Sequence, residues 1–199
     1  MLKRIVFLFI ATNLIIFSLY SCAKNDGRAK LCDFLFSQNF EAEFDFSFID
    51  DNGNEIISGS AKAFKNGKAR IEFLSPEPLS SLTVESDEKG DAGVLIFNYY
   101  GMRTPLADGA LTKVSALLGI FSDELPRKVT SHEAKVFPKS DGEKSLAECV
   151  FSLDGEREIS IVFDKIGGFP EKIVEKREDF TITVTFTKIT PADLLRETT

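Results

Sequence analysis

The feature that most constrains the fold is a strict two-residue alternation of apolar and polar side chains in two segments. In residues 40–48, four phenylalanines and one alanine occupy every second position, and in residues 180–187 apolar residues alternate with threonine. Because successive side chains of a strand point to opposite faces, each segment predicts a strand with one apolar and one polar face. The apolar positions are Phe40, Ala42, Phe44, Phe46, Phe48, Phe180, Ile182, Val184 and Phe186.

Turn signals divide the rest of the chain into further short strands. Glycine-containing pairs that favour tight turns occur at Asn52-Gly53, Asn66-Gly67, Asp154-Gly155 and Gly167-Gly168. About ten strands are expected, over residues 40–48, 57–63, 69–73, 82–84, 94–100, 128–137, 145–153, 158–163, 169–175 and 180–189. Two prolines exclude residues 75–79 from a central strand.

Two segments have helical spacing instead. Leu31, Phe34 and Leu35 predict a short helix over residues 28–38, and apolar residues at helical spacing predict another over residues 108–121. Asp108 is placed to cap the second helix, and Pro126 is expected to stop it. A meander of twisted strands with one apolar face must curl to bury that face. We therefore expect a mainly β fold, an antiparallel incomplete β-barrel closed by the N-terminal helix and the mid-chain helix.

The first 22 residues have the pattern of an export signal. Lys3 and Arg4 precede a mostly apolar run over residues 5–20, which is shorter than a comfortable membrane span. The run ends in Leu19-Tyr20-Ser21-Cys22, which resembles the lipobox of bacterial lipoproteins. Lipid on Cys22 would anchor the chain on the extracytoplasmic side of a membrane, because two acyl chains hold durably. A plain secretory signal and a retained anchor are the alternatives.

The expected domain organisation follows from this signal. It comprises a lipoprotein signal peptide (1–21), a tether (22–29), a single β domain (30–190) and a C-terminal tail (191–199). The formal charge of the whole chain is −7, and loss of Lys3 and Arg4 changes it to −9 (−7 − 2). With no stripe of Lys and Arg, this charge argues against nucleic acid as a partner.

No residue pattern in the sequence supports catalysis or a cofactor. His132 is the only histidine. Its neighbours Ser131 and Glu133 would point to the opposite face of a strand, so that neither is placed to orient its ring. The acidic stretch over residues 50–55 hints at a calcium loop. However, Ala61 stands where a closing glutamate would be needed, and a hairpin turn is the preferred interpretation. We expect no enzyme, no cofactor and no metal site.

Two cysteines remain in the expected domain once Cys22 is modified. Cys149 lies on the apolar face of a predicted strand and Cys32 on the first helix, which should pack against that face. An exported protein can form disulfides. The sequence leaves two states open, a Cys32–Cys149 disulfide and two buried thiols that act as small apolar side chains.

The order of these elements resembles the LolA/LolB-like superfamily. The resemblance rests on a lipobox, an N-terminal helix and a strand meander that is broken once by a helix. It also rests on the stretch Gly67–Pro76 (GKARIEFLSP), which is similar to the family's strand–proline junction. That superfamily includes outer-membrane lipoprotein carriers, the sigma-factor regulator RseB and the germination lipoprotein GerS. The resemblance implies an incomplete barrel around a hydrophobic cavity, and binding of acyl chains or a protein partner.

Two functions follow from these expectations. The first is binding of lipid or lipoprotein acyl chains in a cavity, because the sequence has 19 phenylalanines and small residues at Gly59, Ala61 and Ala63. The cavity candidates are Phe44, Phe46, Ala61, Phe73, Leu117 and Phe186, with Ile182 left unassigned. The second is an envelope protein-interaction scaffold, with a cell-wall enzyme as one conceivable partner. The resemblance makes Leu79 a partner-loop candidate, although Leu79 could simply begin a strand.

Overall fold

A computed structural model describes residues 27–37, 40–66, 68–86, 93–97, 102–105, 112–121, 124–131, 133–141, 144–153 and 155–191. The predicted signal peptide with Cys22, and His132, lie outside these residues. The fold is mainly β, as the alternation predicted. Its strands are β1 (Phe40–Asp50), β2 (Glu55–Asn66), β3 (Lys68–Phe73), β4 (Leu82–Ser86), β5 (Gly93–Phe97), β6 (Met102–Pro105), β7 (Lys135–Asp141), β8 (Lys144–Leu153), β9 (Arg157–Asp164), β10 (Pro170–Lys176) and β11 (Phe180–Pro191).

All eleven strands form one antiparallel sheet that does not close into a barrel. Their order is β6-β5-β4-β3-β2-β1-β11-β10-β9-β8-β7, so the first and last strands pair at the centre. All the other pairs of neighbouring strands are consecutive along the chain. The result is two meanders that meet at β1 and β11, with β6 and β7 as the two edges. The predicted antiparallel sheet is therefore confirmed, and its open form is consistent with the expected incomplete barrel.

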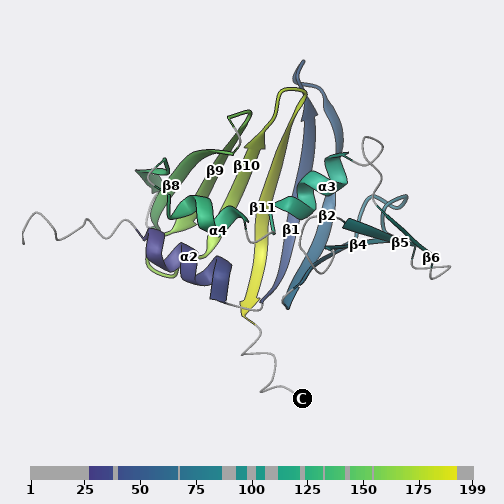
Figure 1. The fold of residues 1–199 in the computed structure, drawn as a ribbon, viewed down its shortest axis with the longest axis horizontal. Coiled ribbons are helices and arrows are strands. Elements are labelled where there is room, and N and C mark those ends of the chain that lie inside the picture. Colours follow the sequence, from purple (N-terminus) through teal and green to yellow (C-terminus); the bar gives the residue numbers. More distant parts are fainter. Residues whose placement is uncertain are drawn as a thin grey trace, which may run out of the picture.

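The helices lie across one face of the sheet (Figure 1). They are α2 (Arg28–Ser37), α3 (Thr112–Gly119) and α4 (Glu124–Val129). Helix α3 contacts β3 and β4, whereas α4 contacts α2 and β8. Within the described ranges no helix combines the length and the apolar character needed to cross a membrane.

The alternation in β1 decides which face of the sheet is buried. Burial follows the sequence pattern, and the four phenylalanines of β1 are at most 4 % exposed. Phe44 pairs with Ala61 of β2 on one side and with Phe186 of β11 on the other. Since paired residues of neighbouring strands share a face, the apolar residues of all three strands form a single surface. The core lies between this surface and the helices.

The segment at residues 124–137 corrects the sequence-based expectation. A strand was expected over residues 128–137, but residues 124–129 form α4 and β7 begins only at Lys135. Pro126 was expected to stop a helix, yet it lies in the first turn of α4. Proline is tolerated there because the first N–H groups of a helix have no intrahelical partner.

The ends of the other helices and strands differ less from the predicted ones. Helix α2 begins at Arg28, inside the expected tether of residues 22–29, and β11 runs to Pro191. Helix α3 is described from Thr112, so the expected cap at Asp108 lies outside the described residues. The short strand β6 was not expected from the sequence. At the β1–β2 hairpin Gly53 has φ +85°, the left-handed conformation that the Asn-Gly pair predicted.

Candidate functional site

A continuous row of phenylalanine rings crosses the buried face of the sheet. Phe34 of α2 stacks on Phe40 with centroids 5.0 Å apart, and Phe121 lies 5.4 Å from Phe44 and 6.3 Å from Phe186. The row continues from Phe44 through Phe46 to Phe73, with the last two centroids 5.6 Å apart. Such pairs contribute about 0.5–1.5 kcal/mol each beyond the area that they bury. Aromatic contacts therefore connect the helical layer to the sheet.

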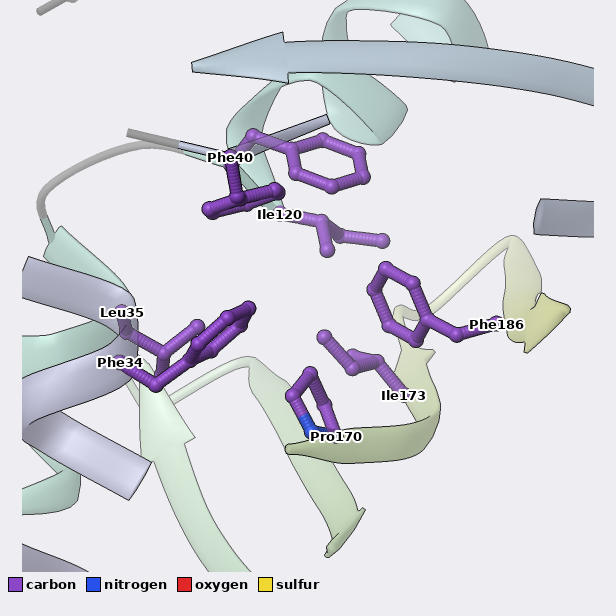
Figure 2. Close-up of a pocket in the computed structure, with 8 residues that line it drawn as sticks. Phe34, Leu35, Phe40, Ile120, Pro170, Ile173 and Phe186 are labelled. Atoms are coloured by element: carbon purple, nitrogen blue, oxygen red, sulfur yellow. The ribbon is translucent and has the colours of Figure 1, made fainter. Parts of the chain in front are cut away.

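The candidate site is a pocket between α2, the turn that follows α3, and the strands β1, β10 and β11. Figure 2 shows its lining side chains converging from these elements on a common space. All of them are apolar: Phe34, Leu35, Phe40, Ile120, Phe121, Pro170, Ile173 and Phe186. Chemically, such a surface can bind an apolar chain, but it offers no group for catalysis.

In this state the pocket is nearly filled. Its volume is about 10 Å³. A cavity of roughly 10–15 Å³ holds a single water molecule, whereas ligand pockets typically measure about 300–1,000 Å³. An acyl chain could therefore enter only if α2 or the turn at Ile120-Phe121 moved away from β10 and β11.

The six cavity candidates all belong to the apolar layer, but only one of them lines this pocket. Phe44, Phe46, Ala61, Phe73 and Leu117 are at most 3 % exposed and form part of the packed core. Phe186 is partly buried and lines the pocket. Sequence reasoning missed the contributions of α2, Ile120 and Pro170, because they depend on how the helices lie on the sheet.

The small residues of β2 do not leave open space in front of them. Ala61 and Ala63 are buried in the core. At Gly59 a Cβ atom would lie 2.1 Å from the carbonyl oxygen of Ser75, because the β3–β4 connection crosses there. In the same connection Leu79 is partly buried and packs against the core.

A buried ionic cluster lies on the same face of the sheet, beyond the pocket. The side chain of Glu175 is 2 % exposed and accepts a hydrogen bond from Arg177 Nε at 2.6 Å. Arg157 Nη1 lies 3.8 Å from the same carboxylate oxygen, and the Arg177 guanidinium lies 5.5 Å from the centre of the Phe180 ring. The sequence contains a signal for this cluster: Glu175 lies two residues after Ile173, and therefore on the apolar face of the strand.

This cluster borders an open, charged groove at one end of the sheet. The groove measures about 690 Å³ and is lined by Asp51, Glu156, Arg157, Arg177, Glu178 and Asp179. Acidic residues outnumber basic ones by four to two in this lining. The groove is polar where the pocket is apolar, so the two would accept different ligands.

The acidic stretch that was considered as a calcium loop has a structural role. Asp50 Oδ1 accepts hydrogen bonds from the backbone N–H groups of Asn52 and Asn54, at 3.0 and 2.7 Å, so residues 50–55 form a hairpin turn. These bonds, that from Asn54 above all, hold the pKa of Asp50 below its usual value. Among the described residues, no group of three or more His, Cys, Asp and Glu could hold a metal ion.

Cys32 and Cys149 are buried thiols in the structure, not a disulfide. Cys32 lies on α2 and is 6 % exposed, and Cys149 on β8 is fully buried. Burial raises the pKa of the Cys32 thiol to about 11, and the neighbouring Asp33 carboxylate adds to the increase. Cys32 is therefore protonated at neutral pH, which makes it a poor nucleophile.

Comparisons with known proteins find the fold but no close relative. No family model matches the sequence, and no curated protein matches it either. Among solved structures, the chain is similar to an uncharacterized conserved protein from Thermus thermophilus. The two share 11 % identity with a TM-score of 0.50 over 82 % of this chain and 85 % of that one.

Two further similarities are weaker in TM-score. A LolA superfamily protein from Nitrosomonas europaea is 8 % identical over 82 % of this chain and 91 % of that one, with a TM-score of 0.45. MucB in the Pseudomonas aeruginosa MucA/MucB complex is 9 % identical with a TM-score of 0.43, and the match covers 84 % of this chain and 56 % of that one. At these identities the comparisons concern the fold alone.

Proposed function

We propose that this chain is a lipoprotein, anchored through Cys22 on the extracytoplasmic side of a bacterial membrane, whose domain binds acyl chains beneath α2. The observation that carries the binding proposal is the pocket lined only by apolar side chains. Its cover consists of α2 and the turn at Ile120-Phe121, which contact the opposite wall through side chains and not through a strand ladder. A cover of this kind can separate from the sheet without breaking the sheet.

Opening the pocket would expose aromatic surface to water unless a ligand replaced it. Each large apolar side chain that moves into water costs about 1.5–3 kcal/mol. An acyl chain that occupies the gap restores this burial, so the open form is favoured only with ligand bound. The filled pocket is consistent with this proposal as the ligand-free form of the site.

The test of acyl binding uses the full lipidated chain in nanodiscs that contain a phospholipid with a diazirine near the end of one acyl chain. After irradiation, peptides from α2 and β10 should carry lipid adducts. Phe186→Ala should increase their yield, because it removes a ring from the lining of the pocket. Phe137→Ala is the matched control, because Phe137 is 49 % exposed on the edge strand β7. Adducts that are absent from α2 and β10 in both the native chain and Phe186→Ala would contradict acyl binding.

The anchor is tested separately. Mass spectrometry of the processed N-terminal peptide should find a diacylglyceryl group on Cys22, and Cys22→Ser should abolish both this mass and membrane association. An unmodified Cys22 at the mature terminus would contradict the anchor and leave the pocket proposal to be judged by the nanodisc experiment.

A second candidate function is an envelope protein-interaction scaffold. The observation that favours it is the small volume of the pocket, about 10 Å³, which is typical of a packed core. Under this function the interior is structural, and a partner binds an edge strand or the connection that contains Leu79. Photo-cross-linking from position 79 in cells should then capture a protein, with position 56 as the control, because Ile56 is exposed on β2, a strand that is paired on both sides.

A further inference from the structure

The turn between β9 and β10 presents two exposed apolar side chains at one end of the molecule. Ile166 is 69 % exposed, more than the other exposed large apolar residues among those described, and Phe169, three residues further on, is 38 % exposed. Apolar side chains that are exposed singly are ordinary. Two on one short turn form a small apolar tip, which we define as Ile166 and Phe169.

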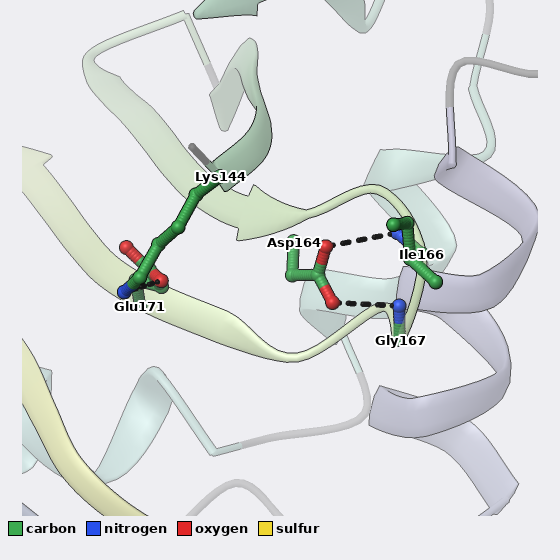
Figure 3. A network of polar contacts seen from close by, with 5 residues as sticks. All are labelled: Lys144, Asp164, Ile166, Gly167 and Glu171. Carbon is green, nitrogen blue, oxygen red and sulfur yellow. Dashed lines mark hydrogen bonds and ion pairs between the residues drawn. The ribbon is translucent and has the colours of Figure 1, made fainter. Parts of the chain in front are cut away.

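This turn has a fixed conformation. Figure 3 shows both carboxylate oxygens of Asp164 bound to the turn: the backbone N–H of Ile166 donates to Oδ1 at 3.0 Å and that of Gly167 to Oδ2 at 2.8 Å. The strand ends are joined by a bond from Asp164 N to the carbonyl of Phe169 at 2.9 Å. The Asp164 carboxylate and a backbone bond hold the turn, so the exposed side chain of Ile166 is not needed to form it.

The apolar tip is attached to the helix that carries the tether. A Cβ atom on Gly168 would lie 2.5 Å from the backbone of Lys30, so α2 rests directly on the turn. Lys30 Nζ also donates to the carbonyl oxygen of Ile166 at 2.5 Å. On the N-terminal side of α2, Gly27 lies against Lys165 in the same turn. The start of the folded domain and the apolar tip are thus fixed side by side.

This position places the tip close to the membrane if Cys22 is anchored there. Five residue steps separate Cys22 from Gly27, and an extended chain spans at most about 18 Å over that length. Resting on the proposed anchor, we propose that the Ile166–Phe169 tip inserts into the outer surface of the bilayer that holds Cys22 and fixes the orientation of the domain on it.

Tethering explains why so small a surface is sufficient. A side chain that the anchor already holds within reach of the bilayer experiences a high effective concentration of lipid, so a weak interaction is enough to dock it. Two polar groups next to the tip are paired within the fold, which lowers the cost of bringing them close to lipid. The Lys30 ammonium donates to the Ile166 carbonyl, and both oxygens of the Asp164 carboxylate accept hydrogen bonds from backbone N–H groups of the turn. The partner that we propose is therefore the phospholipid bilayer that holds Cys22.

The experiment places an environment-sensitive fluorophore at the tip of the full lipidated chain. Ile166→Cys is labelled with an NBD maleimide at pH 7, where the buried Cys32 and Cys149 react slowly. The control is Ile56→Cys, because Ile56 is also exposed, at 46 %, but lies at the opposite end of the sheet. In vesicles of phosphatidylethanolamine and phosphatidylglycerol, the label at 166 should shift to the blue, gain intensity severalfold and be quenched by nitroxide-labelled lipid. The label at 56 should show none of these changes.

Three outcomes would overturn the inference. Equal emission from the two positions, in chains that float with the vesicles and carry lipid on Cys22, shows that the tip stays in water although the anchor is present. A blue shift at 166 that disappears on dilution of the protein at constant lipid shows that a second copy covers the tip. If the chains carry no lipid on Cys22 and do not float with the vesicles, the proposed anchor is wrong. The inference about the tip then fails with it.

Discussion

Glu175 places a carboxylate on the face of β10 that otherwise packs into the apolar layer. Its side chain is 2 % exposed, whereas those of Arg157 and Arg177 are 25 % and 20 % exposed. Taking a carboxylate out of water is costly, and the two guanidinium groups offset that cost. The cluster therefore depends on the carboxylate, because both guanidinium groups contact the same Glu175 oxygen.

We predict that Glu175→Ala lowers the free energy of unfolding by about 2–3 kcal/mol, because it removes the buried carboxylate that both partly buried arginines contact. Glu158→Ala is the matched control. Glu158 is paired with Lys176 at 3.1 Å, but 57 % of its side chain is exposed, and such surface pairs contribute less than about 1 kcal/mol. Urea denaturation of both variants measures the difference. Equal losses would mean that the buried cluster has no special role in stability.

Cys32 has a second consequence at the scale of a single residue. Its pKa is raised to about 11 in the folded chain. The folded state therefore resists ionisation of this thiol, and the resulting stability is complete below the unfolded pKa of about 8.5–9. It is lost as the pH rises from there through about 11.

We predict that the unfolding free energy of the native chain falls more steeply between pH 9 and about 11 than that of Cys32→Ala. Below pH 8 the unfolding free energies of the two chains should change with pH in the same way. They should differ there only by a constant amount, which reflects the lost side chain. Parallel profiles across the whole range would contradict the raised pKa. Thiol titration of the unfolded, non-reduced protein checks the two thiols independently and should count both Cys32 and Cys149.

At the scale of elements, the β3–β4 connection is held against β2 by contacts that allow no side chain at Gly59. Backbone bonds from Leu74 and Ser75 to the carbonyl of Ser60, at 2.8 and 3.1 Å, fix the crossing. Ser75 Oγ also accepts a bond from Ser60 N at 2.9 Å. The glycine is required by this close approach of two backbones and not by its own φ.

We predict that Gly59→Ala destabilises the fold by about 1–3 kcal/mol, the usual cost of forcing extra volume into a packed site. The control is Gly119→Ala at the end of α3, where a Cβ would meet nothing within 4 Å. That substitution should be neutral or slightly stabilising. Thermal denaturation of the two variants distinguishes them, and a neutral Gly59→Ala would show that the connection moves easily.

The alternation of side chains was enough to predict most of the strands, because one buried face imposes a period of two in the sequence. It failed at α4, a helix of six residues in which the buried side chains among those described are Leu125 and Val129, too few to reveal a helical period. It also missed β6, which has four residues. The pocket was the least predictable feature. Its lining brings Phe34, Ile120 and Pro170 together from three distant elements, and that arrangement depends on tertiary packing.

For the whole molecule, an open sheet means two edges that must not pair with other chains. The edge strand β7 carries Pro138, which lacks an N–H donor, between Lys135 and Lys139. Proline and lysine on an edge are common protections against edge-to-edge association. The exposed Phe137 of the same strand would favour association if they were removed.

We predict that the triple variant Lys135→Thr, Pro138→Thr, Lys139→Thr forms dimers or larger species, measured by light scattering after size exclusion. The control is Lys172→Thr with Lys176→Thr, which removes the same two positive charges from β10, a strand paired on both sides. Association of both variants to the same extent would attribute the effect to net charge and not to the edge.

The position of α2 has a mechanical consequence. It is the first described element after the expected tether, it rests on the turn at Gly168, and it supplies Phe34 and Leu35 to the wall of the pocket. Any pull on an N-terminal anchor would therefore be borne by this helix before it reached the sheet. Strain between a membrane and the domain would act first on the wall of the pocket. Tension along the tether would therefore change the occupancy of the apolar site, and occupancy of the site would change the tension.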